Sequence, residues 1–262
     1  MLITSPQNSK IKLVQRLRGK RGRQREARFL IDYERDLQRA LQCGYDIDFV
    51  LHCPDLAPAP GGIEAETHQV TTALFKRVSY RENPDGFIAV LRSKPAKALA
   101  ALEARVVHHA IALVGLAVPG NIGALLRSAD AAGIDAVIVV DIAIDLYNPN
   151  VIRSSTGACF LDNIYVLSGD EALAFLKREG FQLVAADAAG GRTLYEADFQ
   201  PKTALALGAE DRGLPQVWID RADQVARIPM KGAVSDSLNV SVSGALMMYE
   251  MFRQKLASRQ KG

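Results

Sequence analysis

The longest apolar run of the chain, Val106 to Val118, is the feature that most restricts its fold. Its polar interruptions are His108 and His109. A strand with so little polar surface is expected inside a parallel sheet, where helices cover both faces. The run therefore predicts an α/β fold.

Segments of strand-like and helix-like pattern alternate on both sides of this run. Strands are predicted at residues 29–31, 47–52, 86–91, 136–140, 181–186, 203–207 and 224–228, and helices at 32–41, 72–78, 122–132, 172–179 and 240–256. This alternation predicts a mostly parallel sheet between helical layers. Because residues 93–101 have no strong pattern, we expect a small α/β domain at 1–95, a linker at 96–104 and a larger domain at 105–262.

Composition excludes several classes of protein. The 262 residues are 48% hydrophobic, enough to bury a core, and the three cysteines are too few and too widely spaced to indicate a disulfide framework or a zinc site. No cluster of metal ligands is evident, so we expect no metal. No apolar stretch has the length of a signal peptide or a membrane span, which predicts a cytoplasmic protein.

Positive charge is concentrated near the N-terminus. The net charge is only +3, yet nine basic residues lie between Lys10 and Arg28, with Glu26 as the one acid. We call residues 10–28 the basic segment. Such a run is typical of polyanion binding, and nucleic acid is favoured because no membrane signal accompanies it. The alternative is a solvated helix face.

The first of three polar loops follows the long apolar run. Pro119 ends the strand, and a helix is expected to begin near Ile122, with Asn121 as its N-cap. Arg127 lies one and a half turns later and could point over the strand ends, where open α/β sheets bind ligands. The alternative is a capped helix with a surface arginine.

Two further loops follow predicted strands. Gly208 and Gly213 bracket Glu210, Asp211 and Arg212, a pattern that is neither a Walker loop nor a dinucleotide fingerprint. Its acids favour a neutral or cationic ligand over phosphate, although an ordinary turn would look similar.

The third loop runs from Met230 to Asn239, where Ser237 or Asn239 is expected to cap the last helix. Capping alone would explain either residue. Taken together, the three loops can converge on one pocket.

Taken in order, these segments resemble the SpoU-type RNA methyltransferases of the SPOUT superfamily. Asn121 to Ala129 is similar to the first motif, Leu207 to Leu214 to the second, and Ile228 to Met230 with Ser237 to Ser241 to the third. Arg153 to Gly157 resembles a stretch found between the first two motifs. The N-terminal part resembles the small RNA-binding domain that often precedes this catalytic domain, with Ile31-Asp32-Tyr33 where family members often have Val-Glu-Gly.

The resemblance implies a parallel α/β sheet with a C-terminal trefoil knot, a homodimer, and a bound S-adenosylmethionine. It also implies a set of donor-binding residues: Leu207, Gly208, Glu210, Gly213, Ile228, Met230, Ser237 and Leu238. The apolar side chains of the terminal helix would supply either part of the dimer contact or intrachain core.

The implied reaction is methylation of a ribose 2′-hydroxyl, with no metal required. The resemblance assigns the reaction to Arg127, Asn121, Ser237 and Asn239, and we expect RNA to be held by Arg16, Arg18, Lys20, Arg21, Arg23, Arg25 and Arg153. Ribosomal RNA is favoured over transfer RNA because of the N-terminal domain. A non-catalytic RNA-binding or assembly factor with the same fold is the third hypothesis, and the intact motif residues argue against it.

Overall fold

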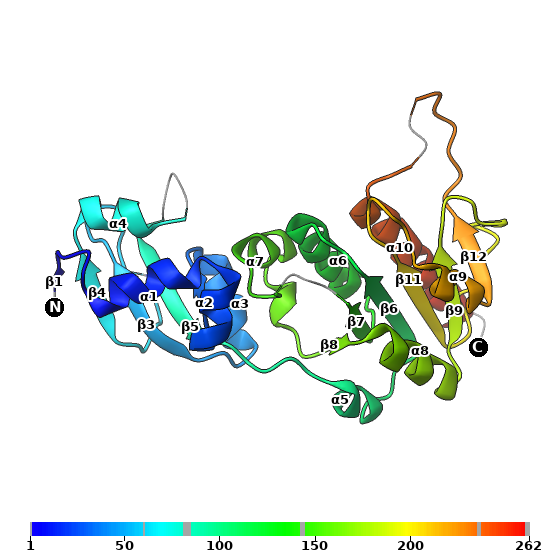
Figure 1. Cartoon of the computed structure of the whole chain (residues 1–262), viewed down its shortest axis with the longest axis horizontal. Helices are drawn as coiled ribbons and strands as arrows, with labels where there is room; N and C mark the ends of the chain where they lie inside the picture. The colour runs from blue at the N-terminus through cyan, green and yellow to red at the C-terminus, as the bar shows by residue number, and fades with distance from the viewer. Residues whose placement is uncertain (1, 60, 81–84, 142–144, 235–236, 260–262) are drawn as a thin grey trace. The chain divides into compact units, whose positions relative to one another are not determined.

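The computed structural model describes residues 2–59, 61–80, 85–141, 145–234 and 237–259 (Figure 1). The chain divides into two compact units. The first unit consists of Met1–Pro95 and Asp145–Leu161, and the second of Ala96–Ile144 and Asp162–Gly262. A segment from the middle of the sequence therefore belongs to the first unit.

The first unit is an α/β unit built on a mixed sheet. Its strands are β1 (Leu2–Ile3), β2 (Arg28–Ile31), β3 (Ile47–His52), β4 (Thr67–Val70) and β5 (Phe87–Arg92). Its helices are α1 (Ser9–Leu17), α2 (Lys20–Glu26), α3 (Glu34–Gln42), α4 (Thr72–Val78), α7 (Pro149–Ser155) and the 3₁₀ helix η1 (Ala158–Phe160). The sheet order is β1-β4-β3-β5-β2, in which β1, β4 and β3 run parallel and β5 is antiparallel to both of its neighbours.

Helix α1 shows how the sequence produces this unit. The side chain of Asn8 accepts a hydrogen bond from the backbone N–H of Lys10 at 2.9 Å, which caps the first turn. Ile11, Val14 and Leu17 recur at helical spacing and are fully buried. They pack with side chains of α4, β3 and β5 in one hydrophobic cluster.

The segment Asp145–Leu161 is joined to the first unit by aromatic side chains. The ring of Tyr147 stacks on Phe29 with 4.5 Å between centroids, and Phe160 lies 5.2 Å from Tyr45. The hydroxyl of Tyr147 accepts a hydrogen bond from the backbone N–H of Lys94 and donates one to its carbonyl, both at 3.0 Å. The predicted continuous domain at 105–262 is thus interrupted, because these contacts join residues that lie far apart in the sequence.

The second unit contains a parallel sheet. Its strands are β6 (His109–Val114), β7 (Ala136–Val140), β8 (Ile164–Leu167), β9 (Gln182–Ala186), β10 (Arg192–Thr193), β11 (Thr203–Leu207) and β12 (Gln224–Arg227), and its helices are α5 (Leu99–Glu103), α6 (Pro119–Ala131), α8 (Gly169–Arg178), α9 (Gln216–Asp220) and α10 (Val240–Arg259). The sheet order is β10-β12-β9-β11-β6-β7-β8, and every strand pair that the structure describes is parallel. The predicted mostly parallel α/β fold is confirmed.

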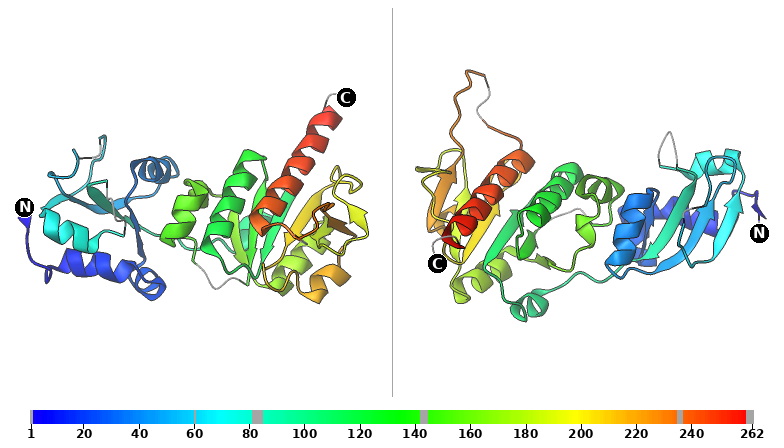
Figure 2. Two further views of the ribbon diagram at one scale, coloured as in Figure 1. Left: turned by 90° about the horizontal axis from the view of Figure 1, so that it is seen from above. Right: turned by 180° about the vertical axis from the view of Figure 1, so that it is seen from behind.

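Helices cover both faces of this sheet (Figure 2). Side chains of α5, α8 and α9 share one hydrophobic cluster with alternate residues of the strands. On the other face α6 and α10 lie side by side. Gly244 of α10 permits this packing, because a Cβ atom there would come within 2.3 Å of Leu125 and 2.8 Å of Leu207.

Two local predictions differ from the structure. The expected patternless linker contains α5, whose Leu102 is fully buried in the second unit. Helix α6 begins at Pro119, with Val118 as its N-cap, so Asn121 lies inside the first turn and not at the cap. Proline is well tolerated at the first helical position, since its missing N–H would have had no partner there. None of the helices that the structure describes is long and apolar enough to cross a bilayer.

Candidate functional site

A cavity of about 670 Å³ lies at the carboxyl ends of β9, β11 and β12. Because these strands are parallel, the loops that follow them meet at one edge of the sheet. The structure brings all eight predicted donor-binding residues to the wall of this one cavity: Leu207, Gly208, Glu210, Gly213, Ile228, Met230, Ser237 and Leu238. The predicted convergence of the second and third loops is therefore present.

The second loop is a closed turn that depends on glycine. Ala209 and Gly213 exchange backbone hydrogen bonds at 3.1 and 2.9 Å. A Cβ atom on Gly208 would lie 2.2 Å from the carbonyl carbon of Gly213 and equally close to the nitrogen of Leu214. Gly213 itself has φ +65°, which favours glycine. The backbone of this turn can thus form part of the cavity wall.

Side-chain amides connect the three loops. Nδ2 of Asn121 donates to Oε1 of Glu210 at 2.5 Å, and Nδ2 of Asn239 donates to Oδ1 of Asn121 at 3.2 Å. The Oδ1 atom of Asn239 accepts a hydrogen bond from the N–H of Ser241 at 2.9 Å, so Asn239 caps α10 as predicted. Residues separated by 89 and 118 positions in the sequence form one network beside the cavity.

Arg127 stands apart from this network. Among the residues that the structure describes, its exposed side chain makes no hydrogen bond or ion pair, and it does not line the cavity. It lies six residues after Asn121 on α6, about 9 Å further along the helix axis. Arg127 therefore lies on the same helix as Asn121, but the side chain of Arg127 does not reach the cavity.

Sequence reasoning missed several lining residues. Asp187 and Ala188 follow β9, and Ser243 and Met247 project from α10. Asp187 directly follows a predicted strand, and this position at a strand end could have indicated that Asp187 lines the site. Across the described ranges, no group of three or more His, Cys, Asp or Glu residues is arranged to hold a metal ion.

Arg23 corrects the prediction for the basic segment. Its side chain is 4% exposed, and its Nε and Nη2 atoms bind the two carboxylate oxygens of Asp145 at 3.1 and 2.7 Å. Nη1 also donates to the carbonyls of Leu17 and Arg18. Because the guanidinium is fully used inside the first unit, Arg23 is a structural residue and is not available to phosphate.

Other arginines of the segment also have partners. Arg16 and Arg25 share the carboxylate of Glu26 at 3.0 and 2.9 Å, and these arginines lower the pKa of Glu26, Arg25 most strongly. Arg18 donates to the carbonyl of Ser79.

The most available charges of the segment are exposed and have no protein partner in the described part of the chain. They are Arg21, which was predicted, and Lys12, which was not. Lys20 is exposed, and Arg153, on α7, is exposed and donates to Asn150.

Comparisons with known proteins agree with the motifs. Residues 108–249 match the SpoU rRNA Methylase family, and residues 8–89 match the MRM3-like substrate binding domain. The 23S rRNA (uridine(2479)-2′-O)-methyltransferase of Streptomyces viridochromogenes is 31% identical, over 98% of this chain and 93% of that protein.

Solved structures give the same result. A crystal structure of an RNA 2′-O ribose methyltransferase is 40% identical, with a TM-score of 0.86 over 98% of this chain and 100% of that one. The SpoU methyltransferase AviRb of S. viridochromogenes, in complex with AdoMet, is 26% identical, with a TM-score of 0.84 over 96% of this chain and 99% of that one. The first family match covers more than half of this chain and contains all three motif segments. The chain belongs to the SpoU rRNA Methylase family.

Proposed function

We propose that this protein is an S-adenosylmethionine-dependent methyltransferase that methylates a ribose 2′-hydroxyl of RNA, with ribosomal RNA favoured over transfer RNA. The observation that carries the proposal is the single cavity that two motif loops line and the third motif contacts through Asn121. One relative described above is named as a 23S rRNA 2′-O-methyltransferase, and the AviRb structure is a complex with AdoMet. Both support the same reaction for this protein. Because ribosomal RNA is the proposed substrate, we expect the enzyme to work in the cytoplasm.

The residues of the cavity suit this donor. A volume of about 670 Å³ is within the range of small-molecule sites. The backbone of the Gly208 turn and the carboxylate of Glu210 provide polar and negative groups for a ligand that carries a sulfonium charge. When bound, S-adenosylmethionine supplies an activated methyl group. The chain's own contribution is to fix its orientation, and the bond from Asn121 holds the Glu210 carboxylate in place.

Arg127 is proposed to hold the RNA. A guanidinium stays protonated, so it serves as a donor to a phosphate oxygen or to the ribose and not as a base. Its exposure and the lack of a partner among described residues leave all of its N–H groups available. Asn121, Ser237 and Asn239 would orient the reacting groups beside it.

A homodimer and a trefoil knot complete the proposal. Apolar side chains at helical spacing form an exposed stripe on α10: Val242, Leu246, Tyr249 and Leu256, each 44–49% exposed. A stripe of this kind on a surface helix favours self-association. Because Arg127 does not line the cavity of its own chain, a dimer could carry it to the cavity of a second copy. The knot rests on the family resemblance and on the parallel sheet of the second unit.

Donor binding and methyl transfer test the proposal separately. We expect calorimetry to detect binding of S-adenosylmethionine, and labelled donor to transfer methyl groups to unmodified ribosomal RNA in preference to transfer RNA. Gly208→Ala should abolish donor binding, because its Cβ would collide with the backbone of the same turn. Gly120→Ala is the matched control, since a Cβ there meets nothing within 4 Å. Normal donor binding by Gly208→Ala would contradict the assignment of this cavity.

Mixing two inactive variants tests whether the active site is shared. We expect Arg127→Ala and Gly208→Ala subunits, each inactive alone, to recover part of the activity when they are co-expressed and form mixed dimers. In such a dimer one intact cavity and one intact Arg127 face each other. Tagged subunits verify that mixed dimers form. If the mixed dimers recover no activity, Arg127 acts at the cavity of its own chain.

A further inference from the structure

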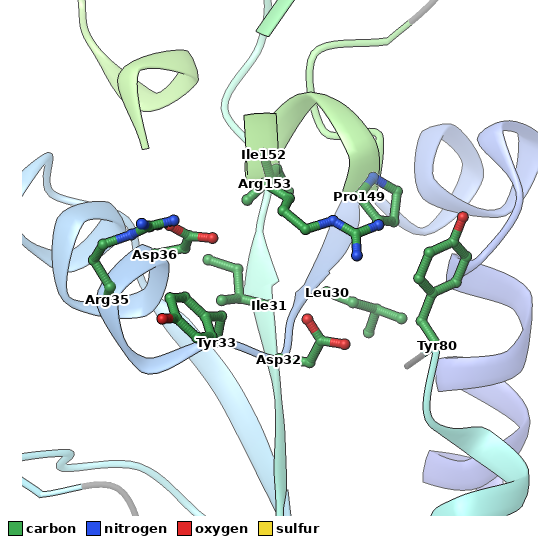
Figure 3. Close-up of a pocket in the computed structure, with 10 residues that line it drawn as sticks. All are labelled: Leu30, Ile31, Asp32, Tyr33, Arg35, Asp36, Tyr80, Pro149, Ile152 and Arg153. Atoms are coloured by element: carbon green, nitrogen blue, oxygen red, sulfur yellow. Dashed lines mark hydrogen bonds and ion pairs between the residues drawn. The ribbon is translucent and has the colours of Figure 1, made fainter. Parts of the chain in front are cut away.

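A second cavity, of about 270 Å³, lies within the first unit between the β2–α3 connection and helix α7 (Figure 3). Leu30, Ile31 and Ile152 supply apolar wall, and they are half-buried or buried. The volume is below the usual range for drug-sized ligands, which limits an occupant to about the size of one nucleotide base.

Exposed tyrosines lie on opposite sides of this cavity in the view of Figure 3. Tyr33 is 40% exposed and Tyr80 49% exposed. Each has an arginine near its ring: the guanidinium of Arg35 is 4.9 Å from the Tyr33 centroid, and that of Arg153 is 6.0 Å from the Tyr80 centroid. Solvent-accessible aromatic rings next to guanidinium groups are the surfaces on which unpaired RNA bases stack.

Arginines lie beside acids in this cavity. Asp36 is 2% exposed, and Nε and Nη2 of Arg35 bind its Oδ1 at 3.1 and 3.0 Å. Burial raises the pKa of Asp36 despite the attraction of Arg35, Arg39 and Arg153. Two arginines, Arg35 and Arg153, and two acids, Asp36 and Asp32, line the cavity, so it offers positive groups to a phosphate and acceptor oxygens to a base without a net charge.

Asp32 adds an acceptor to the same cavity. Its carboxylate lies between Tyr33 and Arg153 in Figure 3. An ionised carboxylate accepts up to about four hydrogen bonds and donates none. A base that offers an exocyclic amino group can donate to it, whereas uracil offers only its N3–H, which lies between two carbonyl oxygens that a carboxylate repels.

We propose that this cavity binds one unpaired nucleotide of the substrate RNA and selects an amino-bearing base, namely adenine, cytosine or guanine, over uracil. The base stacks against Tyr80 and Tyr33 and donates to Asp32, and the phosphates beside it contact Arg35 and Arg153. The proposal rests on RNA as the substrate, as inferred above, and adds a recognition site in the unit that carries no donor cavity.

Short RNAs test the proposal on the full-length protein. The probes are a fluorescent nine-nucleotide oligouridine and three versions with adenosine, cytidine or guanosine at the centre. We expect at least one substituted probe to bind about tenfold more tightly than oligouridine, the discrimination that one good base contact provides. Asp32→Asn should reduce this preference to about threefold or less, since an amide offers a donor where a carboxylate offers an acceptor.

A second variant removes the stacking surface and leaves the acidic side chains unchanged. Tyr80→Ala should weaken binding of the preferred probe about tenfold, as expected for one base–aromatic stack. The matched controls are Asp46→Asn, an exposed acid of the same unit, and Tyr195→Ala, a tyrosine of the second unit that is 71% exposed. Both controls should keep the affinity and the preference, and thermal unfolding should show that every variant is folded.

The proposal is overturned if the wild-type protein binds all four probes equally or not at all. It is also overturned if Asp32→Asn keeps the full preference, if Tyr80→Ala keeps the full affinity, or if the controls lose preference or affinity to the same extent. If the protein methylates ribosomal RNA but shows no base preference, only the proposal for this cavity is refuted. A protein that binds the probes selectively but has no affinity for S-adenosylmethionine would refute the proposed function and leave the cavity standing.

Discussion

The basic segment of the first unit differs from the three motif loops of the second in the partners of its polar side chains. Both regions were predicted to be functional from their residue types. In the basic segment Arg23 is buried against Asp145, and Arg16 and Arg25 share Glu26. In the motif loops the polar side chains bond to one another beside a cavity, and Arg127 remains exposed. A run of arginines thus indicates charge, but only the partners of each guanidinium show which charge is left for RNA.

The largest expected effect is on the buried arginine. Arg23→Ala should lower the free energy of unfolding by about 3–5 kcal/mol, because it leaves a largely buried carboxylate without its partner. Chemical denaturation measures this, and Arg21→Ala, at an exposed position of the same helix, should change stability by less than about 0.5 kcal/mol. Equal effects would remove the distinction between structural and available arginines.

Arg127 should show the opposite behaviour. Arg127→Ala is expected to slow methyl transfer about 100-fold or more, equivalent to about 2.7 kcal/mol, by removing a positioned donor. Stability and donor affinity should stay near those of the wild-type protein, since the side chain has no partner among described residues. Arg221→Ala, another exposed arginine of the second unit, should retain activity. Loss of donor binding in Arg127→Ala would contradict a role in RNA positioning.

Asn239 combines a structural and a functional bond, and two substitutions separate them. Asn239→Ala should cost about 1 kcal/mol of stability through loss of the helix cap. Asn239→Asp keeps the capping acceptor but cannot donate to Asn121, so it should retain stability and lose methyl transfer. If Asn239→Asp is fully active, the amide network is only a cap.

The salt dependence of RNA binding tests the available charges. Each of Lys12→Gln and Arg21→Gln should reduce the log–log slope of affinity against salt by about 0.7–0.9, if each residue contacts one phosphate. Arg16→Gln and Arg25→Gln should change it less, because both are paired with Glu26. Deletion of the first 28 residues is not a suitable test, since it removes Ile11, Val14 and Leu17 from the core. An unchanged slope in the double variant Lys12→Gln/Arg21→Gln would refute the RNA-binding role of the segment.

The smallest expected effect concerns pH. Burial lowers the pKa of His109, with a further contribution from Lys255, so the folded protein favours the neutral imidazole. As pH falls below the ordinary histidine pKa of 6.5, the unfolded chain binds a proton that the folded chain resists, and stability decreases. His109→Gln should remove this part of the pH dependence, whereas His108→Gln, at the exposed neighbour, should not. The same slope in both variants would exclude His109 as its source.

The sequence allowed the alternation of elements, the parallel sheet and the cavity-lining loops to be predicted, because these depend on local patterns and contiguous motifs. Helix α7 and strands β4 and β8 were missed, since each is short and lacks a long periodic run. The pairing of Arg23 with Asp145 was beyond reach, because it joins residues 122 positions apart and no pattern in either segment indicates it. The position of Asn121 inside α6 was misjudged because the helix begins three residues earlier than the apolar periodicity suggests.

The assignment of Asp145–Leu161 to the first unit has a consequence for engineering. The polypeptide passes from one unit to the other three times, after Pro95, before Asp145 and after Leu161. In a chimaera joined at residue 95, the transplanted N-terminal part would lack Asp145, which neutralises Arg23, and Tyr147, whose ring stacks on Phe29. Exchange of substrate specificity between homologues therefore requires two grafts, the N-terminal 95 residues and this inserted stretch, taken from the same donor protein.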